Sequence, residues 1–153
     1  MLRVVLVHPQ IPPNTGNIAR TCAATNTELH LVGPLGFELS DRYLKRAGLD
    51  YWPHVNLHYH ASIDTFQKLQ QQQGGRCIGF STSGRCSYTK FAFQPLDWLL
   101  FGSETQGLPA DVLAACHETV YIPMASQQVR SLNLSVSAAV GLFEAQRQLG
   151  SLE

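Results

Sequence analysis

Short hydrophobic runs alternate along the chain with segments in which apolar residues recur at helical spacing. The first run is rich in β-branched residues, and most of the others end at glycine, proline or small polar residues, as is typical of buried strands. Strands are therefore predicted at Leu2–Val7, Leu29–Val32, Val55–Tyr59, Cys77–Phe80, Trp98–Phe101 and Thr119–Ile122. Strands that alternate with helices predict an α/β fold, with a mostly parallel sheet flanked by helices.

The predicted helices follow these strands. One helix is predicted to begin after Asn14. The others cover Asp41–Ala47, Ser62–Gln73, Pro109–Ala115 and Asn133–Leu149. Asn14 and Ser62 are residue types that cap helix N-termini, so both are expected to be N-caps. Glycines after two of these segments, at Gly48 and Gly74, predict where the helices end.

The final helix carries apolar residues on more than one side. Leu134, Ala138, Leu142, Ala145 and Leu149 mark one face, and Val136, Val140 and Phe143 mark another. A surface helix of a monomer usually has a single apolar stripe, so the second face needs a further cover. A homodimer interface is the preferred explanation, and deeper burial within one subunit is the alternative.

Length and composition fit one domain over residues 1–153, with 44% hydrophobic residues to fill a core. The sequence lacks a run of about 18 apolar residues and a signal-peptide pattern, so a soluble cytoplasmic protein is expected. Eleven basic and eleven acidic residues give zero net charge, which offers no support for a nucleic-acid partner. A basic patch would have to be local, and Arg42, Lys45 and Arg46 would share one helix face.

Cysteine and histidine spacing gives no sign of a metal site. Cys22, Cys77, Cys86 and Cys116 form no CxxC pair, and reduced structural thiols are expected. His54, His58 and His60 lie close together in the sequence, but no carboxylate or cysteine accompanies them at ligand spacing. The expectation is therefore that the protein holds no metal.

Three polar or glycine-rich segments follow predicted strands. They are PPNTGNIAR at 12–20, FGSETQGLP at 101–109 and IPMASQQVRSLNLSVSAAV at 122–140. None contains GxGxxG, a P-loop or GxSxG, which disfavours dehydrogenase, ATP-dependent and hydrolase chemistry. From the residues alone the chain is a ligand-binding α/β domain, with polar candidates at Arg20, Glu104, Arg130, Ser131 and Asn133.

In order and spacing, these segments resemble the three motifs of the SPOUT RNA methyltransferases, and nearly the whole chain resembles the TrmL (YibK-like) family, including RAGLDY at 46–51. The resemblance implies a sheet whose C-terminal part forms a deep trefoil knot, a feature that periodicity does not predict. It also implies S-adenosylmethionine as methyl donor, with S-adenosylhomocysteine as product. The cofactor-binding positions that match are Phe80, Ser81, Gly102, Glu104, Ile122, Met124, Ser131 and Leu132.

Each of these positions also has a simpler interpretation. Ile122 and Leu132 suit core packing, and Gly102 suits a turn that ends a strand. Glu104 suits a solvated loop acid or a cap on the helix near Pro109. If these positions bind the cofactor, the apolar side chains of Ile122, Met124 and Leu132 would form the flat walls that adenine needs.

The resemblance assigns the catalytic role to Arg20. Guanidinium has a pKa above about 12 and presents only donors, so orienting the ribose and stabilising oxyanion charge suit it better than base catalysis. Asn14 and Asn133 are expected to hold Arg20 or the nucleotide, and Ser131 to hydrogen-bond near the methyl donor. A tyrosine common in these enzymes is replaced by Phe143, which puts hydroxyl contacts from this position in doubt.

The function implied is 2'-O-methylation of the wobble ribose, at cytidine or uridine 34 of a tRNA anticodon loop, by a homodimer. RNA contacts are expected from Arg42, Lys45, Arg46, Arg85, Lys90 and Arg130. The alternatives are 2'-O-methylation at another tRNA or ribosomal RNA position, and a non-catalytic RNA-binding α/β module. The residues do not distinguish cytidine from uridine or identify the tRNA isoacceptors.

Overall fold

Seven parallel strands form one sheet in the computed structural model, which describes residues 1–152 apart from the side chains at 48 and 49. The strands are β1 (Arg3–Val7), β2 (Glu28–Val32), β3 (Leu57–His60), β4 (Cys77–Phe80), β5 (Cys86–Ser87), β6 (Trp98–Phe101) and β7 (Glu118–Tyr121). Their order across the sheet is β3-β2-β1-β6-β4-β7-β5, and all the pairings are parallel. The α/β class and the parallel sheet predicted from the hydrophobic pattern are thus confirmed.

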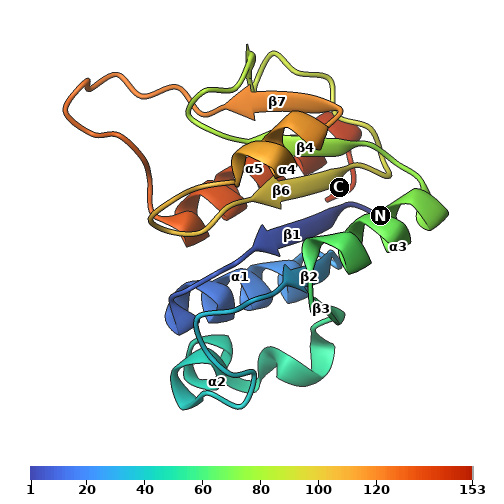
Figure 1. The fold of residues 1–153 in the computed structure, drawn as a ribbon, viewed down its shortest axis with the longest axis vertical. Helices are drawn as coiled ribbons and strands as arrows, with labels where there is room; N and C mark the ends of the chain where they lie inside the picture. The colour runs from blue at the N-terminus through green and yellow to red at the C-terminus, as the bar shows by residue number, and fades with distance from the viewer. Residues whose placement is uncertain (153) are drawn as a thin grey trace.

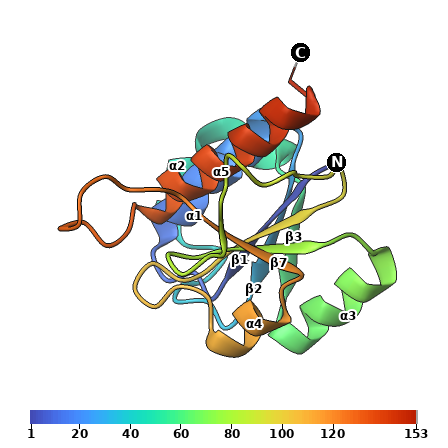
Figure 2. The same ribbon diagram turned by 90° about the horizontal axis from the view of Figure 1, so that it is seen from above.

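Helices cover the two faces of this sheet (Figures 1 and 2). On one side lie α1 (Pro12–Ala24), α2 (Arg42–Gly48), the 3-10 helix η1 (Leu49–His54) and α5 (Leu134–Leu149), and on the other lie α3 (Ile63–Gln73) and α4 (Ala110–Ala115). α1 packs against α2, η1 and α5. No helix within residues 1–152 is long and apolar enough to cross a membrane.

Alternating side chains of the strands supply a core on each face of the sheet. Val4 and Leu6 of β1 pack in a cluster with Ile18 of α1 and Leu142 of α5. Val5 and Val7 join the opposite cluster, which includes Phe66 of α3 and Val112 of α4. Burial on both faces explains why β1 is an uninterrupted hydrophobic run instead of an alternating one.

The predicted strands and helices recur with bounds shifted by at most a few residues, but two local predictions fail. Asn14 is not an N-cap, because α1 already starts at Pro12 with Ile11 in the cap position. Proline lacks the N–H that a cap would satisfy and suits the first helical turn, so the helix begins before Asn14. The two-residue strand β5 was not predicted, because Cys86–Ser87 has no hydrophobic run to mark it.

The last helix is capped at both ends, which the sequence analysis did not predict. The Oδ1 atom of Asn133 accepts hydrogen bonds from the backbone N–H groups of Ser135 and Val136, and Gly150 ends the helix in a left-handed conformation. Its first apolar face is buried, whereas Val136 and Phe143 on the second face remain 47% and 46% exposed. Burial within one subunit therefore does not cover this second face.

The sheet order divides the chain into two halves. β1, β2 and β3 follow one another outward, after which the chain crosses to the other half, and β6 then returns between β1 and β4. The order of the strands does not fix how the chain threads, so the trefoil knot stays a prediction from the resemblance.

Candidate active site

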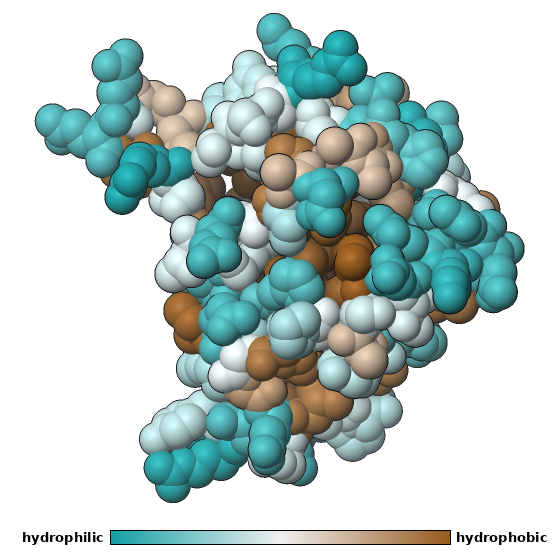
Figure 3. All heavy atoms as spheres, in the orientation of Figure 1, coloured by the Kyte–Doolittle hydropathy of each residue, from teal (hydrophilic) through white to brown (hydrophobic). Residues whose placement is uncertain are grey.

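A cleft of about 690 Å³ lies at the carboxyl ends of β4, β6 and β7. Its lining comes from three loops that follow these strands and from the first turns of α5. Open parallel sheets bind ligands at this end, and the volume suits a nucleotide-sized molecule. The loop between β7 and α5 projects from the body of the molecule, above the hollow visible at the upper left of Figure 3.

Aromatic rings form the floor of the cleft. Phe80 and Phe101, the last residues of β4 and β6, stack with ring centroids 4.5 Å apart. Gly141 of α5 lies against both rings, and a Cβ at this position would meet Cε2 of Phe80 at 2.7 Å. The absence of a side chain on Gly141 thus lets α5 close one side of the site.

The loop after β6 is a tight backbone turn. Ser103 and Gly107 pair as an antiparallel bridge, and Gly107 has a φ of 69°, in the left-handed region that favours glycine. A Cβ on Gly102 would overlap the backbone of Gly107 and Leu108. Gly102 therefore allows the loop to fold back on itself and leaves its own backbone facing the cleft.

Glu104 joins this loop to the start of α1. Its carboxylate accepts hydrogen bonds from the backbone N–H groups of Gln10 at 2.9 Å and Ile11 at 2.8 Å, and from Nδ2 of Asn14 at 3.3 Å. A negative charge at a helix N-terminus is stabilised by the free N–H groups and the helix dipole. Glu104 thus caps α1 from the loop after β6, and neither simple interpretation, a solvated acid or a cap on α4, describes its contacts.

Asn14 and Asn133 extend this connection to the third segment. The buried Asn14 accepts a hydrogen bond on Oδ1 from Nδ2 of Asn133, at 3.2 Å. Asn133 at the same time caps α5. The predicted motif residues Asn14, Glu104 and Asn133 therefore form one network that fixes the relative positions of α1, the loop after β6 and α5.

Arg20 lies apart from this network. Its guanidinium is exposed and sits over the ring of Tyr51, 5.2 Å from the centroid. Arg20 is not among the described residues that line the cleft. The side chains of Asn14 and Asn133 do not hold it either, because their hydrogen bonds go to each other and to neighbouring groups such as Glu104. Within one chain, then, the predicted catalytic arginine and the cleft are separate, whereas Ser131 lines the cleft.

All eight predicted cofactor-binding residues line this single cleft, as does Arg130. The other predicted RNA contacts lie elsewhere on the surface: Arg42, Lys45 and Arg46 are exposed on α2, and Arg85 and Lys90 are exposed beyond β4. The lining also includes residues that sequence reasoning did not single out, among them Thr82, Thr105, Gln106, Leu108 and Ser137. Most of these additional residues are neighbours of predicted residues on the same loops, and this proximity in sequence is the signal that could have identified them.

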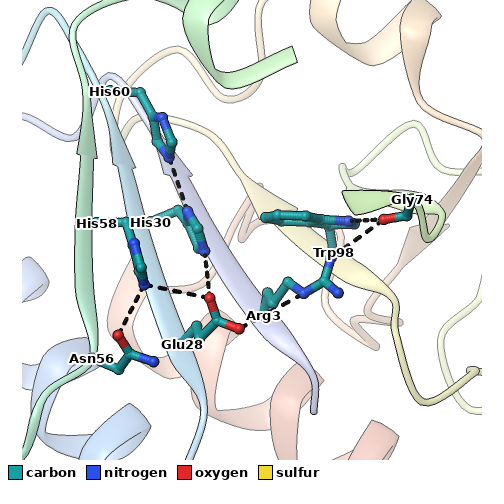
Figure 4. A network of polar contacts seen from close by, with 8 residues as sticks. All are labelled: Arg3, Glu28, His30, Asn56, His58, His60, Gly74 and Trp98. Atoms are coloured by element: carbon teal, nitrogen blue, oxygen red, sulfur yellow. Dashed lines mark hydrogen bonds and ion pairs between the residues drawn. The ribbon is translucent and has the colours of Figure 1, made fainter. Parts of the chain in front are cut away.

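A second polar cluster runs along β2 and β3 (Figure 4). Nδ1 of His30 lies 2.9 Å from Nε2 of His60, and Nε2 of His30 lies 3.2 Å from Oε1 of Glu28. Nε2 of His58 lies 3.4 Å from the same oxygen, and Arg3 approaches the other carboxylate oxygen. The expectation that no carboxylate accompanies these histidines holds along the sequence but not in space, because the pairing of β2 with β3 brings His58 beside Glu28.

Glu28, His30 and His58 place one ligand atom each within 4.8 Å of the others. However, the rings of His30 and His58 are stacked with an angle of only 10° between their planes. A zinc ion lies near the plane of each imidazole that binds it, about 2 Å from the nitrogen. Because the stacked rings lie in separate, nearly parallel planes with centroids 4.5 Å apart, one ion cannot lie near both planes, and these side chains are arranged as a hydrogen-bonded network.

Burial sets the character of the histidines and thiols in this half of the molecule. Desolvation, followed by the neighbouring His58, His60 and Arg3, lowers the pKa of His30 to about 3. Burial also raises the pKa of Cys22 and of Cys77 to about 12. All four cysteines are free in the described chain, and protonated buried thiols are unreactive, as expected for structural cysteines.

The parallel sheet, with a cleft of loop backbone, aromatic floor and small residues at its carboxyl end, defines an α/β protein whose cleft suits a nucleotide-sized ligand. Residues 1–143 match the model of the SpoU rRNA methylase family, and the chain belongs to this family.

Two of its relatives have nearly the same length as this chain, and a third is longer. A protein of Synechocystis sp., provisionally named tRNA (cytidine(34)-2'-O)-methyltransferase, is 61% identical over 99% of both chains. A solved structure described as giving insights into the 2-OH methylation of C/U34 on tRNA superimposes with a TM-score of 0.94, at 51% identity, over 98% of this chain and 97% of the other. The SpoU methyltransferase AviRb of Streptomyces viridochromogenes, solved with AdoMet, gives a TM-score of 0.89 at 28% identity, over 99% of this chain and 58% of its own.

Proposed function

We propose that this chain, acting as a single domain over residues 1–153, is an S-adenosylmethionine-dependent methyltransferase that modifies the ribose 2'-oxygen of nucleotide 34 in tRNA. The observation that carries the proposal is the convergence of the eight motif residues on one cleft. The close similarity to relatives with this named activity, over the full chain, supports the choice of substrate. Action on tRNA implies a cytoplasmic enzyme.

The cleft suits S-adenosylmethionine on its own features. Ile122, Met124 and Leu132 offer apolar walls for a flat adenine, and the tight loop at Gly102 presents backbone for hydrogen bonds. Ser81 and Ser131 add hydroxyl groups at the edges. When bound, the cofactor supplies an electrophilic methyl group, and the protein's own residues must bring the ribose hydroxyl to it.

Arg20 is proposed to handle the ribose hydroxyl. Its guanidinium carries only donors and stays protonated, so it orients the ribose or the adjacent phosphate and stabilises negative charge that develops on the 2'-oxygen. The Asn14–Glu104–Asn133 network holds the segments that carry Arg20 and the cleft in register. Much of the rate enhancement then comes from positioning.

A homodimer would bring Arg20 and the cleft together. Arg20 is exposed on α1 and does not line the cleft of its own chain, as far as residues 1–152 describe it. α1 packs beside α5, whose second face exposes Val136 and Phe143. We therefore propose that α5 faces pair in the dimer and that Arg20 acts at the partner's cleft.

Replacing Phe143 with Glu would place a charge in this interface. The expected result is a monomer by light scattering, with methylation lost and the folded state retained by circular dichroism. Arg147→Gln, on the same helix at a side chain that is 69% exposed, changes the charge by the same amount and is the matched control. A Phe143→Glu protein that stays dimeric and active would rule out this interface.

RNA binding is proposed to rest on dispersed basic residues: Arg42, Lys45, Arg46, Arg85, Lys90 and Arg130. Because these side chains would release counterions from phosphates, tRNA affinity should fall steeply as salt is raised. Binding that is independent of salt would contradict the electrostatic part of the proposal.

The deciding experiment is methyl incorporation from labelled S-adenosylmethionine into tRNA that lacks this modification, followed by mapping of the modified nucleotide. Label at the ribose of nucleotide 34 supports the full proposal. Label at another tRNA or ribosomal RNA position keeps the reaction and replaces the substrate. Cofactor binding without transfer to any RNA would favour a binding module instead.

Arg20→Ala separates catalysis from binding in the same assay. Loss of a charge-stabilising donor should lower the methylation rate by about a hundredfold to a thousandfold. Cofactor affinity, measured by calorimetry, should stay near that of the unaltered protein, since Arg20 is proposed to contact the ribose and not the cofactor. A rate close to the unaltered one would assign Arg20 to structure alone.

A further inference from the structure

Two exposed tyrosines on α2 and η1 each lie against an arginine. The guanidinium of Arg42 is 4.8 Å from the ring centroid of Tyr43, and its Nη2 donates a hydrogen bond to the tyrosine hydroxyl at 2.9 Å. The guanidinium of Arg20, from α1, is 5.2 Å from the ring centroid of Tyr51. Tyr43 is 46% exposed and Tyr51 is 42% exposed.

Packing of this region depends on other side chains. Leu44 of α2 is fully buried, and the partly buried Trp52 of η1 packs against the core and donates a hydrogen bond from Nε1 to the carbonyl of Lys45. The two tyrosine rings instead keep much of their surface in solvent. A large aromatic surface left exposed beside cations suits a ligand that has both flat rings and negative charge.

Lys45 and Arg46 add positive charge to the same helix, and both are exposed. Asp41, the acidic residue at the start of α2, is engaged in capping, because its Oδ1 accepts hydrogen bonds from the backbone N–H groups of Tyr43 and Leu44. Asp50 precedes Tyr51 and offsets part of the charge. Recognition here would therefore rely on ring stacking as much as on charge.

The position of the tyrosines relates them to Arg20. The guanidinium of Arg20 lies over the ring of Tyr51, and Tyr43 belongs to α2, which packs against α1. Arg20 is proposed to hold the reacting ribose at the partner's cleft. Tyr51 thus lies next to the residue that would hold this ribose, where neighbouring nucleotides of the same loop would pass.

We infer that Tyr43 and Tyr51 form a base-stacking surface for unpaired nucleotides that flank the methylated one in the tRNA anticodon loop. The inference rests on the proposed function and adds to it the residues that distinguish a single-stranded loop from a duplex. Unpaired bases stack on aromatic rings, whereas the bases of a helix are already stacked on each other. The arginines above the rings would contact the adjacent phosphates.

Binding of a synthetic RNA hairpin with the sequence of an anticodon arm, and with 2-aminopurine beside the wobble position, tests the inference. Stacking on the unaltered protein should quench the fluorescence of the aminopurine. Tyr51→Leu and Tyr43→Leu should each raise the Kd for the hairpin about tenfold and reduce the quenching. Tyr51→Phe and Tyr43→Phe keep the rings and should restore both properties.

Two controls show that the variants are folded and that the effect is local. Cofactor affinity and thermal unfolding should be the same in the leucine variants as in the unaltered protein. Tyr59→Leu removes a tyrosine that is 51% exposed on the edge strand β3, outside the α2–η1 segment, and should bind the hairpin normally. In steady-state assays the leucine variants should raise the KM for tRNA far more than they lower kcat.

The outcomes separate this inference from the proposed function. If the unaltered protein methylates nucleotide 34 and the leucine variants bind and quench as it does, the stacking surface is wrong and the function stands. If the protein methylates no tRNA, yet quenching occurs and depends on the rings, the function is wrong and the surface stands. If the unaltered protein neither methylates tRNA nor quenches the aminopurine, both are overturned.

Discussion

Two carboxylates, Glu104 and Glu28, each organise a polar network, and they lie at opposite ends of the parallel sheet. Glu104 follows the carboxyl end of β6 and accepts hydrogen bonds from the start of α1. Glu28 is the first residue of β2 and is in contact with His30, His58 and Arg3. One network borders the cleft, and the other extends between strands under α3.

The connectivity of the two networks differs. Glu104, Asn14 and Asn133 join segments that are about 90 to 120 residues apart in sequence, and two of these segments, the loop that holds Glu104 and the start of α5, line the cleft. The Glu28 network joins residues of adjacent strands, which the sheet pairing already aligns. The first network therefore sets the geometry of a site, whereas the second affects stability, and substitutions should separate these two effects.

Glu104→Ala should have the largest effect. Losing the acceptor of three hydrogen bonds frees α1 from the loop after β6, and a displacement of about 1 Å in a reacting group costs on the order of a hundredfold in rate. Methylation should fall by about that factor, with weaker cofactor binding. Glu104→Gln keeps one acceptor oxygen and should lose less. A fully active Glu104→Ala enzyme would show that the Glu104 network does not set the geometry of the site.

The Glu28 network should instead respond to pH through stability. The pKa of His30 is lowered from 6.5 to about 3, chiefly by burial, and burial also lowers the pKa of His60. Below about pH 6.5 the unfolded chain takes up protons that the folded chain excludes, so stability falls as the pH drops toward 3. At about pH 4.5 the free energy of unfolding should be lower than at pH 7 by about 2.5 kcal/mol from His30 alone.

Urea unfolding of His30→Gln across this pH range provides the comparison. The amide side chain offers a donor to Glu28 and an acceptor to His60 without titrating, so its profile should be flatter than that of the unaltered protein. Cofactor affinity at neutral pH should not change, because His30 lies outside the cleft. Equal pH slopes for both proteins would show that His30 does not carry the effect.

Much of the sheet was predictable because local sequence determines it. β4 and β6 have the predicted bounds, since each is a short buried run that ends where a small-residue loop begins. Helix α3 also lies where it was predicted, because Ser62 caps its start and Gly74 follows its last residue. The start of α1 was wrong because two signals competed there, and Pro12 prevailed over Asn14. The strand order was not predicted, since no local pattern encodes it, and the threading stays a prediction from the resemblance.

The site was predictable as a set of residues but not as a set of contacts. Family motifs placed Glu104 and Asn133 near the cofactor, yet nothing in the sequence indicated that Glu104 would cap α1 or that Asn133 would pair with Asn14. The His30–Glu28 network was missed for a related reason. It depends on the register between β2 and β3, and separations along the chain do not reveal that register.

The smallest expected effect comes from replacing two N-caps, Asn133 of α5 and Ser62 of α3. Each side chain accepts hydrogen bonds from the first turn of its helix, so replacement by alanine should lower the free energy of unfolding by about 1 kcal/mol in both cases. Only Asn133 also donates to Asn14 at the cleft. Asn133→Ala should therefore lower methylation as well, while Ser62→Ala should not.

Asn133→Ser separates capping from bridging within one residue. Serine keeps an oxygen for the helix N-terminus but lacks the Nδ2 donor, so thermal unfolding should stay near that of the unaltered protein. Methylation should nevertheless fall as it does in Asn133→Ala, because the link to Asn14 and Glu104 is broken. If Asn133→Ser recovered full activity, the cap alone would account for Asn133, and the network at the cleft would affect stability just as the Glu28 network does.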